Sequence, residues 1–326
     1  MRYLVGIDLG GTNIVSGCVA EDGSDIRGVH HCPTGSEEGA DKVVERIIRA
    51  AQESIAETRA ALPGVEIIGA GIGSPGPLDT RTGVVLLTPN LGWVNMPLRE
   101  RVQAGLGLRT ALDNDANCAV LGEWWRGAAR GTKQAVGLTI GTGIGGGIII
   151  DGRLYHGASD IAGEIGHMTI DADGRRCKCG NYGCVEAYAS GPNIALRAVE
   201  AIESGAPSAL PAMVGGDLTR VTAQTVYDAA QAGDALAHEV VRDTARFLGA
   251  AVGSLINIFN PEAVVIMGGV TLAGDSLFDP LRREVSRRAF KPAVQVCRIV
   301  AGTLVGVAGV YGAARAFQEQ VESGII

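Results

Sequence analysis

The sequence predicts an α/β protein of two similar domains, and three observations support this fold class. The chain has 326 residues, 46% of them hydrophobic, so it is long enough to bury two cores of ordinary size. Apolar segments with the length of strands alternate with segments of helical periodicity, which is typical of a mainly parallel sheet covered by helices. A glycine-containing strand pair near the N-terminus also occurs a second time, about 130 residues further on.

The first predicted domain begins with a hairpin. Residues 3–11 and 13–19 are predicted strands, joined by a tight turn at Gly10-Gly11-Thr12. Residues 40–60 carry apolar side chains at helical spacing, and residues 65–73 return to an apolar strand.

The predicted junction of the domains follows the next strand. Residues 108–112 form this strand, after which Asn114 or Asp115 caps a helix that continues through Trp125. The first domain therefore comprises residues 1–115.

The repeat lies beyond this junction. Residues 5–12 read Val-Gly-Ile-Asp-Leu-Gly-Gly-Thr, and residues 136–143 read Val-Gly-Leu-Thr-Ile-Gly-Thr-Gly. Two copies predict two similar domains with a ligand cleft between them, although a chance match of two glycine-rich hairpins is an alternative.

The remaining elements complete the second domain. Residues 237–259 are a predicted helix, residues 263–267 a strand and residues 308–321 a final helix that packs back on the first domain. The second domain is thus residues 116–309, and residues 310–326 return to the first.

Composition excludes several classes of partner. The net charge of -7 comes from 35 acidic and 28 basic residues without a basic run, so a nucleic-acid partner is not expected. Glycines and charges interrupt every hydrophobic run, so no membrane span is expected, and the N-terminus lacks the pattern of a signal peptide. We therefore expect a cytoplasmic protein.

The two glycine turns are candidate phosphate-binding loops. Polyphosphate is held by backbone N–H groups, and Gly10-Gly11-Thr12 and Gly141-Thr142-Gly143 leave such groups accessible. Neither has the Walker or Rossmann pattern, and each taken singly could be a plain hairpin turn. Asp8 ends an apolar strand beside the first loop, where it could hold Mg²⁺ through water or bond the amides of the turn.

Three of the seven cysteines form the most specific motif. His167 precedes Cys177, Cys179 and Cys184, whereas the four isolated cysteines are expected in the core, and an odd count does not suggest disulfides. Three thiols and one imidazole predict a closed, structural zinc site; a reduced thiol loop without metal is the alternative.

Further polar residues lie near these motifs. Glu164 and Glu186 flank the metal motif and could accept hydrogen bonds from sugar hydroxyls; otherwise these two are ordinary solvated carboxylates. The second ring nitrogen of His167 could also contact a sugar hydroxyl. Asn114 and Asp115 offer an amide and a carboxylate, the latter a candidate base for phosphoryl transfer as well as a candidate helix cap.

These motifs together resemble the ROK family of repressors, open reading frames and kinases, and within it the bacterial ATP-dependent glucokinases. The resemblance spans nearly the whole chain. Its motifs are Asp8-Leu9-Gly10-Gly11-Thr12, Gly73-Ser74-Pro75-Gly76-Pro77, Asn114-Asp115-Ala116-Asn117, Gly141-Thr142-Gly143-Ile144-Gly145-Gly146-Gly147, Glu164-Ile165-Gly166-His167 and the cysteine motif.

The resemblance implies an actin-like ATPase fold of hexokinase type, ribonuclease H-like, whose two domains close on the sugar. It implies ATP-dependent phosphorylation of glucose at the 6-hydroxyl, the first step of glycolysis, with Mg²⁺, structural zinc and a homodimer or homotetramer. Asp115 is the implied base. The implied sugar ligands are Gly76, Asn90, Asn114, Asp115, Glu164, His167 and Glu186. The implied nucleotide contacts are Asp8, Gly10, Gly11, Thr12, Asn13, Thr142, Gly143, Gly268 and Gly269.

Two departures from the family pattern matter. Val270 follows Gly268-Gly269 where many relatives have a third glycine, which leaves the donor preference open, and the helix-turn-helix domain of the family's repressors is not expected. The motifs do not separate glucose from N-acetylmannosamine, N-acetylglucosamine, mannose or another hexose. A sugar-binding regulator without catalysis and an actin-like assembly module are the other classes considered.

Overall fold

The chain forms two compact units in a computed structural model that describes residues 1–326. Unit 1 comprises Met1–Lys133, Gly147–Gly163 and Thr303–Ile326, and unit 2 comprises Gln134–Gly146 and Glu164–Gly302. This division differs from the predicted boundary at residue 115. The physical reason is that helix α3 (Asp115–Arg126) packs on the C-terminal helix α11 (Ala308–Glu322) and so remains with unit 1.

Unit 1 is built on a five-stranded mixed sheet with the order β3-β2-β1-β4-β8. Its strands are β1 (Arg2–Leu9), β2 (Asn13–Ala20), β3 (Ile26–Pro33), β4 (Glu66–Ser74) and β8 (Thr110–Asn114). β1, β4 and β8 are parallel, whereas β2 pairs antiparallel with both β1 and β3. The predicted hairpin is confirmed, and β3 is a strand that the sequence pattern did not reveal.

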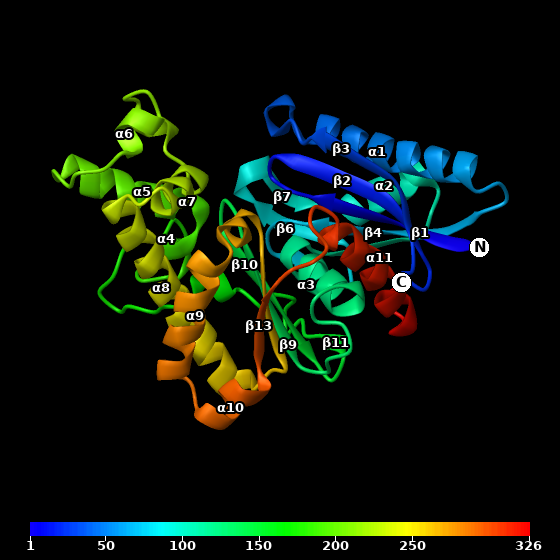
Figure 1. The fold of residues 1–326 in the computed structure, drawn as a ribbon. Helices are drawn as coiled ribbons and strands as arrows, with labels where there is room; N and C mark the ends of the chain where they lie inside the picture. The colour runs from blue at the N-terminus through cyan, green and yellow to red at the C-terminus, as the bar shows by residue number, and fades with distance from the viewer. The chain divides into compact units, whose positions relative to one another are not determined.

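Helices cover both faces of this sheet (Figure 1). α1 (Ala40–Ala61) and α2 (Leu98–Leu106) lie on one face, and α3 and α11 lie on the other. Side chains of β1 alternate between the faces: Val5 and Ile7 pack with α1, whereas Leu4 packs with α11. Asp8 follows the same alternation as Leu4, which directs its carboxylate toward α11.

A second, three-stranded sheet in unit 1 has the order β5-β6-β7. It consists of β5 (Leu78–Asp79), β6 (Val84–Thr88) and β7 (Trp93–Met96), with the 3-10 turn η2 (Pro89–Leu91) between the last two. Trp93 is 2% exposed and joins the main core of the unit, so this small sheet is packed against it and holds the intervening turn in place.

The second five-stranded sheet has the order β11-β10-β9-β12-β13, the same sequence of connections as the first. Its strands are β9 (Ala135–Ile140), β10 (Ile144–Ile150), β11 (Arg153–Leu154), β12 (Ala263–Met267) and β13 (Arg298–Ala301). β12 is parallel to β9 and to β13. The chain passes from unit 2 into unit 1 within β10. The identical strand order supports the internal repeat.

Helices of unit 2 enclose its core around the long helix α8 (Ala235–Phe259). The other helices are α4 (Glu186–Ala189), α5 (Gly191–Glu203), α6 (Leu210–Met213), α7 (Ala223–Gln231), α9 (Asp275–Arg288) and α10 (Lys291–Val296). The short turns η1 (Ser36–Glu38), η3 (Ile165–His167), η4 (Leu218–Arg220) and η5 (Gly269–Ala273) complete the chain.

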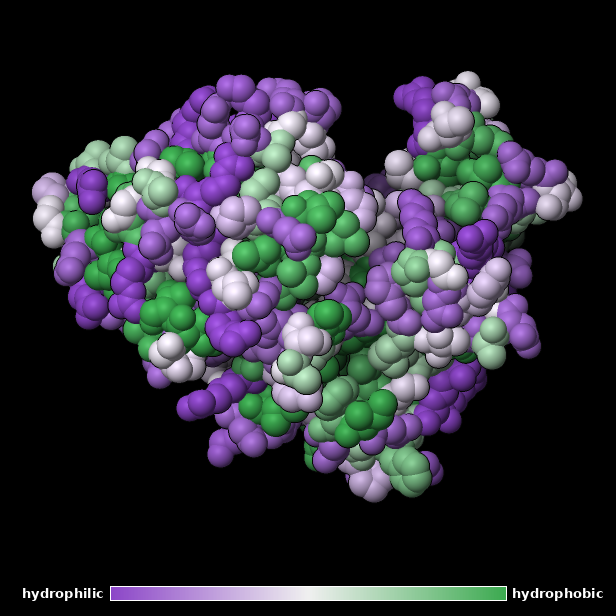
Figure 2. All heavy atoms as spheres, turned by 180° about the vertical axis from the view of Figure 1, so that it is seen from behind, coloured by the Kyte–Doolittle hydropathy of each residue, from purple (hydrophilic) through white to green (hydrophobic).

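The surface is mixed in character. Figure 2 shows hydrophobic residues in small patches among hydrophilic ones on the face that it presents. None of the helices combines the length and the apolar character that a bilayer crossing requires.

Candidate functional site

The end of β8 and the start of α3 form a corner that carries Asn114 and Asp115. Asn114 is the N-cap of α3: its side-chain oxygen accepts hydrogen bonds from the N–H groups of Ala116 at 2.9 Å and Asn117 at 3.1 Å. Asp115, the first helical residue, accepts a hydrogen bond from the Ala116 N–H at 2.8 Å. Of the two candidate caps the structure selects Asn114, so the helix does not depend on Asp115 for its cap.

Asp8 is electrostatically coupled to this corner. Burial, together with the negative charge of Asp115, raises the pKa of Asp8 to about 7. Its carboxylate lies against the first turn of α11, where a side chain at Gly309 would collide with it. The negative charge of Asp115 makes ionisation of the Asp8 carboxyl group more costly, and a bound divalent cation would offset this cost.

The first glycine loop is held from behind by Thr34, a fully buried residue directly after β3. The Thr34 N–H donates to the carbonyl of Thr12 at 2.8 Å, and its hydroxyl donates to the carbonyl of Gly10 at 2.8 Å. In a trans peptide unit the C=O and the following N–H point in opposite directions, so the N–H groups of Gly11 and Asn13 point away from Thr34. Thr34 thereby fixes the direction of the peptide groups that a phosphate would contact.

Two more of the predicted sugar ligands lie in unit 1. Gly76 has a φ of 87°, and a side chain there would collide with the carbonyl of Leu87, so its backbone conformation requires glycine. Asn90 lies in η2 next to the first glycine loop, with its Nδ2 3.9 Å from the position that a Cβ on Gly11 would take. The structure thus brings Asn90 to the first glycine loop.

The second glycine loop is held by a carboxylate. Gly141 donates to the carbonyl of Gly143 at 2.9 Å and accepts a hydrogen bond from Gly191 at 2.9 Å. Glu186, at the start of α4, accepts a hydrogen bond from the Ile144 N–H at 2.8 Å, and its Oε2 lies 2.6 Å from where a side chain on Gly143 would begin. Glu186 is therefore a partner of the loop, and not an ordinary solvated carboxylate.

Thr142, Gly268 and Gly269 complete the predicted nucleotide contacts of unit 2. Thr142 lies at the exposed tip of the second loop. Gly268 follows β12 with a φ of 97°, and its close approach to the carbonyl of Ile140 places it beside the start of that loop. Gly269 begins η5.

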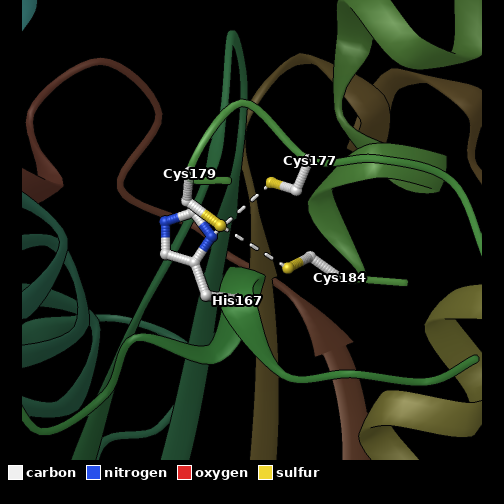
Figure 3. Close-up of side chains that lie close together, drawn as sticks. All are labelled: His167, Cys177, Cys179 and Cys184. Carbon is white, nitrogen blue, oxygen red and sulfur yellow. Dashed lines mark hydrogen bonds between the residues drawn. The ribbon is translucent and has the colours of Figure 1, made fainter. Parts of the chain in front are cut away.

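The four predicted metal ligands come together in unit 2 (Figure 3). One potential ligand atom from each of the four residues lies within 4.8 Å of all the others. The Cys179 and Cys184 sulfurs are 3.7 Å apart, and the Cys177 sulfur is 3.9 Å from Nδ1 of His167. In a tetrahedral zinc site, ligand distances of about 2.0 Å for nitrogen and 2.3 Å for sulfur separate ligand atoms by about 3.5–3.8 Å. The donor set and its spacing fit zinc.

His167 lies between the cysteine cluster and the carboxylate of Glu164. Its Nδ1 faces the thiols, and its Nε2 lies 4.0 Å from a carboxylate oxygen of Glu164. The Glu186 Oε1 lies 4.0 Å from the Cys177 sulfur, so Glu186 lies between the metal cluster and the second glycine loop. Three of the predicted sugar ligands therefore lie in or beside the cysteine cluster of unit 2: His167 belongs to it, and Glu164 and Glu186 lie next to it.

The sequence pattern missed several residues that support the site. Thr34 follows a strand that was not recognised. Asp113 is 2% exposed and accepts a hydrogen bond from the N–H of Asn114 at 2.8 Å; it belongs to β8, which continues past the predicted end of the strand at residue 112. The one usable signal was the acidic residue directly after the predicted strand of residues 108–112, because a carboxylate at the end of a buried strand requires partners.

Comparison with known proteins places the chain in a family. The sequence profile of the ROK family matches residues 4–320. A glucokinase of Thermotoga maritima is 39% identical over 319 residues, which is 98% of this chain and 98% of that protein.

Solved structures agree with the sequence comparison. A ROK family glucokinase from Streptomyces griseus, in complex with glucose and AMPPNP, has a TM-score of 0.81 and 33% identity over 96% of this chain and 98% of that one. A ROK family transcriptional regulator homologous to the E. coli MLC protein has a TM-score of 0.85 and 27% identity, over 99% of this chain and 79% of that one.

The fold is thus that of the two-domain, actin-like ATPases, with two glycine loops and a carboxylate-bearing corner. The chain belongs to the ROK family. Since a glucokinase and a regulator of the family both superimpose on it, the fold alone does not distinguish catalysis from regulation.

Proposed function

We propose that the protein is a glucokinase, which transfers the γ-phosphoryl group of ATP to the 6-hydroxyl of glucose. The observation that carries the proposal is the 39% identity to a glucokinase over 98% of both chains. The Asn114-Asp115 corner, electrostatically coupled to Asp8, supports it, because phosphoryl transfer needs a base for the attacking hydroxyl and charge compensation at the phosphates.

Asp115 is the proposed catalytic base. Its backbone is fixed at the start of α3, and the Ala116 N–H donates to its carboxylate at 2.8 Å. This carboxylate would accept the proton of the 6-hydroxyl as the new O–P bond forms. Gly76, Asn90 and Asn114 of unit 1 are proposed to bind sugar hydroxyls, as are Glu164, His167 and Glu186 of unit 2.

The two glycine loops are proposed to bind ATP through backbone N–H groups. The proposed contacts are Asp8, Gly10, Gly11, Thr12, Asn13, Thr142, Gly143, Gly268 and Gly269. Asp8 suits a Mg²⁺ bound with ATP, since a cation favours the ionised form of a carboxylate whose pKa burial has raised. Mg²⁺ supplies charge neutralisation at the phosphates when it is bound.

The cysteine cluster is proposed to hold one structural zinc ion. Four protein ligands leave no open coordination position, so the metal would shape the loop that carries His167 and Glu186 and take no part in phosphoryl transfer. Reduced cysteines of this kind are typical of a reducing compartment, and we propose a cytoplasmic location.

The decisive experiment is a coupled ADP-release assay with ATP and polyphosphate as donors and a panel of hexoses as acceptors. The proposal predicts ADP release with ATP and glucose. Preferred turnover of N-acetylmannosamine, N-acetylglucosamine or mannose would replace glucose as the substrate, and sugar binding without ADP release would favour a regulator.

The role of Asp115 has its own test. We expect Asp115→Ala to lower kcat by roughly 10²–10⁴-fold, because the base acts in the transition state, while glucose binding by isothermal titration calorimetry stays near normal. Asp22→Ala is the control, since Asp22 is a turn carboxylate of the same unit that bonds the Ser24 N–H at 2.9 Å. Near-normal kcat in Asp115→Ala would remove Asp115 from this role.

The oligomeric state is proposed to be a homodimer or homotetramer, as the resemblance implies. Light scattering coupled to size-exclusion chromatography decides it, because a protomer of 33.5 kDa gives well separated masses for the monomer, dimer and tetramer. A monomer at the concentrations used in the assay would contradict this proposal.

A further inference from the structure

A buried carboxylate lies directly before the Asn114-Asp115 corner. Asp113, in β8, is 2% exposed, and it belongs to neither the proposed sugar ligands nor the proposed nucleotide contacts. A carboxylate taken out of water is costly unless its oxygens have partners, so its surroundings should explain its presence.

Both oxygens of Asp113 have partners. Oδ1 accepts hydrogen bonds from the N–H of Asn114 at 2.8 Å and from Nδ2 of Asn117 at 3.2 Å. Oδ2 lies 2.8 Å from Nε2 of His156. The carboxylate therefore joins the start of α3 to a residue that is 43 positions further along the chain.

His156 is charged at neutral pH in this environment. Burial alone lowers its pKa, but the hydrogen bond and charge of Asp113 outweigh burial, and the charges of Asp160 and Glu319 add to them, so the pKa of His156 rises to about 9. Glu319 of α11 is itself paired with Arg315 at 3.5 Å. Three carboxylates therefore act on the imidazolium of His156, and one of them, Glu319, is partly compensated by Arg315.

The segment that carries His156 is fixed independently at a second point. The carboxylate of Asp160 accepts hydrogen bonds from the N–H of Thr80 at 2.8 Å and from its hydroxyl at 3.0 Å. The N–H of Ala162 donates to the carbonyl of His156 at 3.1 Å. Asp160 also has a φ of 58°, an uncommon backbone conformation for a residue other than glycine, which the surrounding contacts have to maintain.

We propose that the His156–Asp113 ion pair is a positioning device for the catalytic base, an inference that rests on the proposed kinase function. Asp113 holds the N–H of Asn114, which is the N-cap of α3, and the side chain of Asn117, which lies in the first turn of α3. Asp115 stands between them. His156 keeps the Asp113 carboxylate in the orientation that makes both bonds, and neither residue touches a reacting atom.

The expected effect is on turnover and glucose use, and not on nucleotide binding. Asn114 and Asp115 share the corner, so its displacement should lower kcat and raise the KM for glucose, whereas the glycine loops keep their own contacts. We expect His156→Ala to lower kcat/KM for glucose by about 10–100-fold and to leave the KM for ATP within about twofold.

His156→Gln separates positioning from charge. The amide of glutamine can still donate to Asp113, so this variant should recover part of the activity that His156→Ala loses. The wild-type enzyme should also lose kcat as the pH rises through about 9, where the imidazolium of His156 deprotonates, and His156→Gln should lack this alkaline limb.

A matched control is available in the same unit. His30 pairs with Glu57 at 3.0 Å, and its side chain is 32% exposed compared with 27% for His156. His30→Gln should keep the wild-type kcat and pH profile. Thermal melts and circular dichroism of every variant establish the folded fraction.

The outcomes distinguish this inference from the proposed function. A wild-type protein that releases no ADP with any hexose contradicts the proposed function itself. An active wild type whose His156→Gln variant keeps full kcat and the alkaline limb contradicts the positioning role. So does a His156→Gln variant that does not fold, or one whose activity falls only in proportion to its folded fraction, because either result indicates a purely structural ion pair.

Discussion

The two glycine loops are copies of one sequence motif, yet they are supported by different chemistry. The first loop is held by Thr34, a neutral residue that binds two of its carbonyls at 2.8 Å. The second is held by Glu186, a carboxylate that binds the Ile144 N–H at 2.8 Å and lies 4.0 Å from the sulfur of Cys177.

This difference indicates which of the two glycine loops would depend on a metal held by the cysteine cluster. Glu186 comes two residues after Cys184, so a change in the cysteine loop is transmitted directly to the second glycine loop. The first loop has no such connection within its unit, because Thr34 is in turn held by Arg46 of α1, which donates to its carbonyl at 3.0 Å. The two equivalent glycine turns are thus expected to respond differently to changes in the cysteine cluster.

The largest effect is expected when one of the four predicted zinc ligands is removed. We expect the native protein to contain one zinc per chain by elemental analysis, and Cys179→Ala to lower Tm on the order of 10 °C and to weaken glucose binding, because structural zinc contributes directly to folding. Cys297→Ala, which removes a cysteine outside the cluster, is the control. A metal-free native protein with full activity would falsify the zinc assignment.

Glu186→Gln should have an intermediate effect. The amide oxygen of glutamine can still accept a bond from the Ile144 N–H but without a negative charge, and hydrogen bonds to charged groups are the stronger ones. We expect kcat/KM for both ATP and glucose to fall by roughly 10-fold, with zinc content unchanged. If kcat/KM falls for glucose but not for ATP, Glu186 acts on the sugar, and its bond to the second glycine loop has no effect on the nucleotide.

Thr34→Val should have the smallest effect, and it should be confined to the nucleotide. Valine retains the N–H bond to Thr12 but loses the hydroxyl bond to Gly10, a loss of about 1 kcal/mol or somewhat more for a buried partner. The KM for ATP should rise by about 5–10-fold at constant KM for glucose, and Thr34→Ser should restore it. Thr58→Val, which removes a buried hydroxyl that donates to the Ser54 carbonyl of its own helix and also bonds Cys18 in β2, is the control, because neither partner belongs to the loop.

Motifs that are local in sequence were predictable. The first hairpin, the helix over residues 40–61, and the association of His167 with three cysteines all depend on contacts between residues close in the chain or on an unmistakable set of donors. The strand order of the second sheet supports the repeat that the resemblance of residues 5–12 to residues 136–143 suggested.

Support from distant residues was not predictable. Thr34 reaches the first loop because β3 pairs with β2, and β3 has too few consecutive apolar residues to be recognised as a strand. His156 reaches Asp113 only through tertiary packing. The spacing of Glu186 indicated a place near the metal, but not that its carboxylate binds the second glycine loop, because that contact depends on how α4 is placed against β10.

The packing of α11 also constrains how the protein is made. This helix covers the face of the first sheet that includes Leu4, and it packs on α3 as well. A ribosome synthesises residues 308–322 after every residue of unit 2, so the apolar face of β1 lacks its cover for most of translation. The nascent first unit therefore exposes this apolar face until synthesis is nearly complete, and exposed apolar surface of this kind favours aggregation.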